Sequence, residues 1–173
     1  GNGENITITG GTVIATGGFS AAGIGGGREG KGENITITGG TVNATGDGGA
    51  GIGGGGAAAS DIELWGSNGG NGEDITINGG TVTAEGGDHG AGIGGGAKGS
   101  GSNVTVSGAA QVTAIAGKSN GYYGAGATIG NGGDFTGSEN VDGKEIQADI
   151  SRVTTGYIHH IIYDPALVSE DNP

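Results

Sequence analysis

The chain has 173 residues, of which 48 are glycine, and 18 acidic residues oppose six basic ones to give a formal net charge of -12. Nucleic acids and anionic membranes both require clustered Lys and Arg, so this charge disfavours them as partners. Cysteine is absent, which excludes a disulfide framework and Cys-ligated zinc, and no apolar run is long enough to span a membrane.

One short motif, Ile-Gly-Gly-Gly, recurs along the chain at residues 24–27, 52–55 and 93–96. A degraded fourth copy is Ala127-Thr128-Ile129-Gly130. Glycine accepts positive φ angles and close backbone contact because it has no Cβ. The recurrence therefore predicts a sharp turn at the same place in each of several stacked coils.

The first coil shows the pattern that later coils repeat. In chain order it predicts a strand over 4–9, a turn at 10–11, a strand over 12–15, a loop over 17–20 and a strand over 21–25. The pattern restarts at Glu33, and Ile6 and Ile35 lie about 29 residues apart. Three short strands in a period of this length predict a three-sided β-solenoid.

Aligning the copies predicts which side chains point into a shared core. The expected inward positions are Ile6, Ile8, Ile35, Ile37, Ile75, Ile77, Val104 and Val106 on the first side, Val13, Ala15, Val42, Ala44, Val82, Ala84, Val112 and Ala114 on the second, and Ile24, Ile52, Ile93 and Ile129 on the third. One position lies between the two inward residues of each second-side strand, and its residue type varies freely. We therefore expect this position to face outward.

Two segments interrupt the period. Residues 56–71 lengthen the third coil, and there Ile62 and Leu64 could form the first-side strand, with Ile75 and Ile77 displaced into an added strand, or the segment could be a plain insertion. Residues 117–124 lengthen a loop of the fourth coil.

The repeat ends near residue 133, which divides the chain into solenoid repeats over 1–133 and a C-terminal cap and exit segment over 134–173. Strand-forming stretches in the second part are suited to covering the unpaired edge of the last coil. We therefore predict an all-β fold: a right-handed parallel β-helix of about four coils with a β-rich cap. The chain begins within a repeat, so we expect it to belong to a longer multidomain protein.

Stacking should align the loops between the second and third sides, at 17–20, 46–49, 86–90 and 117–124, into what we call the loop ridge. It should carry aromatic rings at two levels with carboxylates between them, a mixture that suits carbohydrate because rings cover sugar C–H faces and carboxylates bind hydroxyls. The candidate ligand-binding residues are Phe19, Asp47, Asp88, His89, Tyr122 and Tyr123, with Trp65 as a secondary candidate. The alternative is that these are ordinary surface loops, with Tyr122 or Tyr123 folded back over the adjoining coil.

No catalytic or metal-binding residues are predicted. Acidic residues are scattered over turns rather than paired across a cleft, as a glycosidase requires, and no nucleophilic triad is apparent. No cofactor is expected; calcium is possible, but its Gly-Gly-x-Gly-x-Asp repeat does not recur. His159 and His160 are adjacent in an expected strand and so point to opposite faces.

The repeated segment Asn-Ile-Thr-Ile-Thr-Gly-Gly-Thr-Val-x-Ala-Thr-Gly-Gly, followed by Ala-Gly-Ile-Gly-Gly-Gly, resembles repeats in large surface proteins of Gram-positive anaerobes, including gut species. It is distantly similar to clostridial β-helical carbohydrate-binding modules over residues 3 to about 133. The resemblance implies a cell-wall or secreted location and adhesion or polysaccharide binding. Those modules carry Asp-rich calcium sites that this chain lacks, so neither calcium nor ligand is carried over.

These observations favour a non-catalytic binding module of an extracellular, cell wall-associated or secreted adhesin-like protein. Its expected partners are host or plant glycans, or a matrix protein. The main alternative is a passive spacer that holds another domain away from the cell wall. A polysaccharide-degrading enzyme and an ice-binding protein, the latter suggested by the outward row Thr7, Thr36, Thr76 and Thr105, are less favoured.

Overall fold

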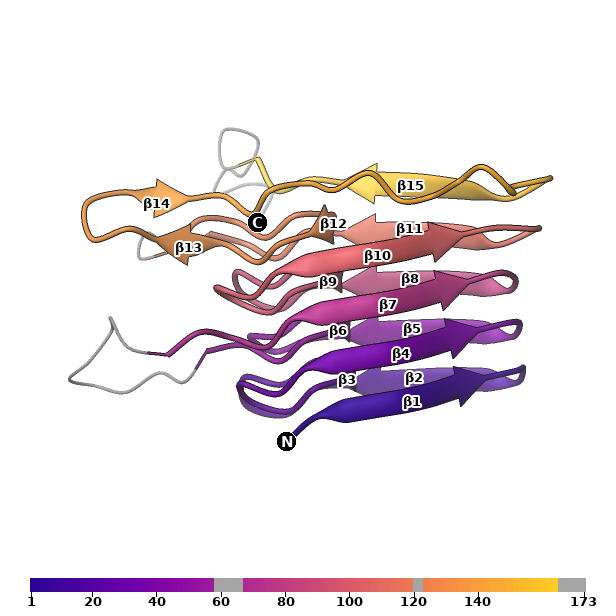
Figure 1. Cartoon of the computed structure of the whole chain (residues 1–173), viewed down its shortest axis with the longest axis horizontal. Coiled ribbons are helices and arrows are strands. Elements are labelled where there is room, and N and C mark those ends of the chain that lie inside the picture. Colours follow the sequence, from indigo (N-terminus) through magenta and orange to yellow (C-terminus); the bar gives the residue numbers. More distant parts are fainter. Residues whose placement is uncertain (58–66, 120–122, 165–173) are drawn as a thin grey trace, which may run out of the picture.

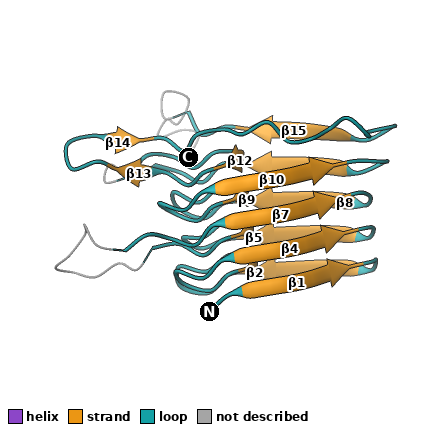
Figure 2. Cartoon of the chain, viewed as in Figure 1, coloured by secondary structure: helices purple, strands orange, loops and turns teal. Residues whose placement is uncertain are grey.

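Three parallel sheets run along the molecule, and each successive coil of the chain adds one strand to each sheet (Figure 1). The computed structural model describes residues 1–57, 67–119 and 123–164. These residues contain strands and loops but no helix (Figure 2), and so no helix able to cross a membrane. The predicted parallel β-helix is confirmed.

The first sheet has the order β1-β4-β7-β10, and its strands pair in register from coil to coil. The register aligns Ile6, Ile35, Ile75 and Val104, so equivalent repeat positions stack directly. The strands are β1 (Gly3–Ile8), β4 (Gly32–Ile37), β7 (Gly72–Ile77) and β10 (Gly101–Val106).

The second and third sheets follow the same coil order. The second consists of β2 (Thr12–Thr16), β5 (Thr41–Thr45), β8 (Thr81–Glu85), β11 (Gln111–Ile115) and β15 (Tyr157–Ile161). The third consists of β3 (Ile24–Gly25), β6 (Ile52–Gly53), β9 (Ile93–Gly94) and β12 (Ile129–Gly130). An antiparallel pair, β13 (Asp134–Phe135) and β14 (Asn140–Val141), follows the fourth coil.

The predicted inward positions form one continuous core. Ile35, Val42 and Ile52 are fully buried, as are their equivalents in coil three, and the first-coil residues Ile6, Ile8, Val13 and Ala15 pack against them. The outward second-side position is confirmed by Ile14, which is 77% exposed. Alternation along each strand therefore separates core from surface, as the two-residue strand period requires.

The glycine motif makes the corner that the sequence predicts. The glycine after each third-side Ile has positive φ: 128° at Gly25, 136° at Gly53 and 133° at Gly94. A Cβ on Gly53 would lie 2.0 Å from the carbonyl oxygen of Gly94 in the next coil. Only glycine satisfies both constraints, because other residues rarely adopt this φ and none could avoid the contact.

A second backbone irregularity recurs within the first sheet. Asn5, Asn34, Asp74 and Asn103 all have φ between 51° and 57°, and the strand pairing skips each of them. Asn and Asp tolerate this left-handed conformation better than other non-glycine residues. This left-handed conformation, repeated in every coil, is the structural reason for an Asn or Asp at this repeat position.

The ambiguity over the third coil is resolved in favour of an insertion. β7 pairs directly with β4, with Ile75 opposite Ile35 and Ile77 opposite Ile37. The first-side strand of coil three is therefore the one that contains Ile75 and Ile77. Ile62 and Leu64 lie outside the described residues.

The segment after residue 144 forms a partial fifth coil. Asp149 bridges Thr105 on the first side, and β15 pairs with β11 over its full length on the second. On the third side no fifth strand is present among the described residues; instead the Glu145 carboxylate accepts hydrogen bonds from the backbone N–H groups of Thr128 (2.5 Å) and Ile129 (3.1 Å). In earlier coils the acceptor of such a hydrogen bond is a backbone carbonyl of the next coil; for example, Ile24 N donates to Gly51 O.

Replacing Gly53 with alanine should prevent the third coil from stacking on the second. We expect G53A to lose about 3 kcal/mol or more of unfolding free energy, because it combines a glycine-only backbone conformation with a backbone clash. Urea denaturation followed by circular dichroism measures the loss. G10A is the matched control: a Cβ there meets nothing within 4 Å, so its midpoint should stay close to wild type. Equal midpoints for the two variants would contradict the proposed role of the corner.

Candidate ligand-binding groove

Backbone hydrogen bonds join successive loops of the loop ridge. Asp47 N donates to Ala21 O (3.1 Å), Asp88 N donates to Asp47 O (3.0 Å), and His89 N donates to Lys118 O (3.0 Å). The loops of the four coils are therefore held at the spacing of neighbouring strands, about 4.8 Å. This arrangement agrees with the expectation that the four loops form a continuous ridge.

A groove of about 450 Å³ runs beside the ridge where it meets the C-terminal segment. Its lining includes the charged residues Asp47, Glu85, Asp88 and Lys118 together with Ile161, Ile162 and Tyr163. Glycines of the ridge, including Gly46, Gly86 and Gly87, also line it. The groove thus combines charged groups, glycine backbone, apolar side chains and one aromatic ring.

Asp47 has a structural as well as a surface role in this groove. Its Oδ2 accepts a hydrogen bond from Ser20 N at 2.9 Å, which fixes the carboxylate against the preceding coil. Asp88 and Lys118 are exposed, so their charged groups face solvent. Three carboxylates and one ammonium leave the groove with a local excess of negative charge.

Only part of the predicted candidate set lies in the groove. Asp47 and Asp88 line it, whereas Phe19 is 68% exposed on the first coil and does not. Tyr122 and Trp65 fall outside the described residues. His89 and Tyr123 lie together beneath the ridge rather than along the groove.

His89 is 7% exposed and serves as a packing residue of the ridge. Its Nδ1 lies 3.0 Å from Gly124 O, so this nitrogen carries the proton and donates to the carbonyl. The Tyr123 ring lies 5.2 Å from the imidazole and 6.4 Å from the Phe135 ring, centroid to centroid. Tyr123 therefore folds back over the adjoining coil, the alternative considered for it above. Burial lowers the pKa of His89 and raises that of Tyr123.

Several residues of the groove were not among the predicted candidates, including Lys118 and Tyr163. Glu85 is the last residue of β8 and points outward, where the equivalent residue of β5 is Thr45. Ile161 and Ile162 are brought to the ridge because β15 pairs with β11. The sequence shows that 157–163 forms a strand, but not which sheet receives it.

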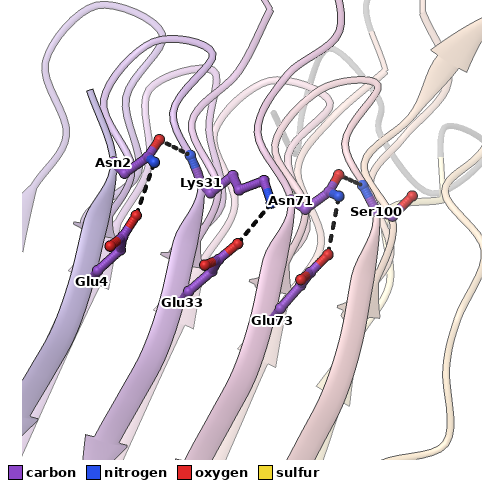
Figure 3. Close-up of polar contacts among 7 residues, drawn as sticks. All are labelled: Asn2, Glu4, Lys31, Glu33, Asn71, Glu73 and Ser100. Carbon is purple, nitrogen blue, oxygen red and sulfur yellow. Dashed lines mark hydrogen bonds and ion pairs between the residues drawn. The ribbon is translucent and has the colours of Figure 1, made fainter.

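A different polar surface lies along the start of the first-sheet strands (Figure 3). Glu4, Glu33 and Glu73 stack in register, and each accepts a hydrogen bond from the residue two positions before it: Asn2 (2.9 Å), Lys31 (2.8 Å) and Asn71 (3.1 Å). Asn2 and Asn71 also accept hydrogen bonds from the next coil: Lys31 N donates to Asn2 Oδ1, and Ser100 N donates to Asn71 Oδ1. The hydrogen bond to Glu33 and the charges of Glu33, Glu73 and Glu4 raise the pKa of Lys31. These contacts offset the repulsion between stacked carboxylates.

The described residues contain no group of three or more His, Cys, Asp or Glu side chains placed to hold a metal ion.

Comparison with known proteins identifies the repeats. Three segments, residues 6–28, 35–56 and 75–97, match a family model described as a β-helix repeat. The chain contains a β-helical repeat region. Each matched segment runs from the first-side strand of a coil to the glycine corner after its third-side strand. No curated protein and no solved structure matches the chain significantly. The β-helical repeat and the stacked sheets together indicate a structural or binding solenoid.

The lowered pKa of His89 predicts a pH-dependent stability that this residue alone should supply. In the unfolded chain the histidine takes up a proton near its ordinary pKa of 6.5, but in the folded protein it does so only at lower pH. The unfolded state therefore binds more protons in this window, and stability falls as pH drops from about 7.5 to 5.5.

The substitution His89→Asn tests this, because Asn tolerates the local φ of 65° and does not titrate. We expect the urea midpoint of H89N to vary less between pH 7.5 and 5.5 than that of wild type. His159 and His160 are present in both proteins and serve as an internal control. An unchanged pH dependence would mean that another group is responsible.

Proposed function

We propose that the chain is a non-catalytic glycan-binding module and that the groove beside the loop ridge is its binding site. The observation that carries this proposal is the composition of the groove: carboxylates and an ammonium line it together with Ile161, Ile162 and Tyr163. Sugars present hydroxyls at their edges and C–H groups on their faces, so such a site offers partners to both. Its volume falls within the range of roughly 300–1,000 Å³ typical of small-ligand sites.

The charge of the groove favours some glycans over others. Asp47, Glu85 and Asp88 repel carboxylate and sulfate groups, so uronic acids and sulfated polysaccharides are disfavoured. Neutral sugars can donate their hydroxyls to the carboxylates and accept from Lys118. We therefore propose neutral oligosaccharides of host or plant origin as the ligand class.

A passive spacer is the second candidate, and the regular stacking of the coils supports it. Every coil is joined to the next by in-register parallel pairing, and the core is continuous along the stack. Such a body is suited to holding another domain at a distance. An extracellular, cell wall-associated location is part of the proposal under either function and rests on the resemblance of the repeat given above.

Binding to a glycan array, followed by calorimetry with the strongest neutral oligosaccharide, tests the proposal. We expect D88N and Y163A each to weaken binding about tenfold. D88N removes a charged hydrogen-bond acceptor and Y163A removes an aromatic contact, each worth about 1–1.5 kcal/mol. Neither residue belongs to the core, so melting temperatures should stay near wild type.

The matched control is E33Q, which changes a carboxylate on the first sheet, away from the groove. It should bind as wild type does. Absence of binding to every neutral glycan, with the protein folded, would favour the spacer. Binding that Y123A abolishes but Y163A leaves intact would place the site elsewhere on the ridge.

A further inference from the structure

A second, larger cavity of about 660 Å³ lies at the C-terminal end of the solenoid, next to the groove, with which it shares Ile162. Its apolar walls include Ile146, Val153 and Ile158, which also pack against the top of the core. Its polar lining residues are Gln147, Tyr157 and a cluster joined by hydrogen bonds: Thr128, Glu145 and His160. The lining is therefore mainly apolar, with one hydrogen-bonded polar cluster.

The cavity exists because the fifth coil is incomplete. The second sheet gains β15, but among the described residues β12 is followed on the third side only by an isolated antiparallel bridge between Gly130 and Glu145, whose carboxylate accepts the N–H groups of Thr128 and Ile129. The third side of the fifth coil is therefore only partly closed. Ile150, Tyr157 and Ile162 line the opening and are 50%, 50% and 68% exposed.

The hydrogen bonds at the polar end have a defined direction. An ionised carboxylate only accepts, so the Thr128 hydroxyl donates to Glu145 Oε2 at 2.9 Å. That hydroxyl has one proton, and its oxygen must then accept from Nδ1–H of His160, 2.5 Å away. In the neutral imidazole with Nδ1 protonated, Nε2 is an acceptor. Glu145 already accepts three hydrogen bonds, whereas no described residue donates to Nε2, so Nε2 is an acceptor available to a bound molecule.

We propose that this cavity binds a small, uncharged, mainly apolar molecule that carries one hydroxyl group, with the hydroxyl donating to His160 Nε2. The volume suits a small molecule of one or two rings or a short branched chain. The nearby Glu145 carboxylate disfavours an anion, and the apolar walls disfavour a sugar. This site shares Ile162 with the groove of the glycan proposal, but its ligand class and its test are separate.

Calorimetric titration of the full chain with 2-naphthol tests the site directly, and 2-methoxynaphthalene is the matched probe without the donor. We expect saturable one-to-one binding of 2-naphthol, about fivefold to tenfold tighter than that of the ether, the effect of one neutral hydrogen bond. In H160A both probes should bind alike. This loss of discrimination separates a direct hydrogen bond from a merely structural role of His160.

Ile150→Lys tests the location, because it places a charge at the opening without touching the core. We expect I150K to abolish binding of both probes while the melting temperature holds. Ile14→Lys is the control: Ile14 is also exposed but lies on β2 of the first coil, so I14K should bind as wild type does.

Three results would overturn the proposal. The first is a folded, monomeric wild-type protein that binds neither probe. The second is binding that I150K leaves unchanged. The third is a wild-type dimer that does not bind 2-naphthol and that I150K dissociates in sedimentation velocity, which would assign the apolar opening to a second copy of the chain.

Discussion

The close approach of backbones at the third-side corner is the constraint on which the rest of the structure depends. A Cβ on Gly25, Gly53 or Gly94 would lie 2.0–2.1 Å from a carbonyl oxygen of the next coil, far inside van der Waals contact. With glycine there, the three sheets can all keep the ordinary strand spacing of about 4.8 Å. The narrow core, with its rows of Ile and Val, is a consequence: no single coil buries enough apolar surface to be stable, but the stack does.

The same spacing determines what the surface can do. Residues at one repeat position form a column, so the solenoid presents rows of like side chains, such as the three stacked glutamates of the first sheet (Figure 3). Where such a column carries like charges, neighbouring residues must neutralise it, as Lys31 does for Glu33. A concave, chemically mixed site needs a departure from the repeat. The groove meets this condition because Ile161, Ile162 and Tyr163 come from outside the repeat and lie beside the Asp47–Asp88 column.

The core and the corner could be predicted from sequence because each is repeated. Four aligned copies show that Val42 and Val82 face inward and that Asn43 and Thr83 do not, with no knowledge of the tertiary structure. The candidate site was predictable only where it belongs to a repeated loop, as with Asp47 and Asp88. The burial of His89 was not predicted because a polar residue in a loop suggests exposure, whereas here Tyr123 and Gly124 of the next coil contact it. The position of β15 depends on the path of a single, unrepeated segment, and one copy gives no alignment from which to infer it.

Thr128 shows how the end of a repeat can acquire chemistry that its interior cannot. The equivalent residues in the first three coils are Gly23, Gly51 and Gly92, and a Cβ on Gly92 would lie within 2.9 Å of the backbone of coil four. Above Thr128 no further strand of the third sheet lies among the described residues, so a side chain fits, and its hydroxyl joins Glu145 to His160. The substitution that degrades the glycine motif is thus permitted only in the last full coil. It is also what places a polar cluster against the open end of an otherwise apolar core.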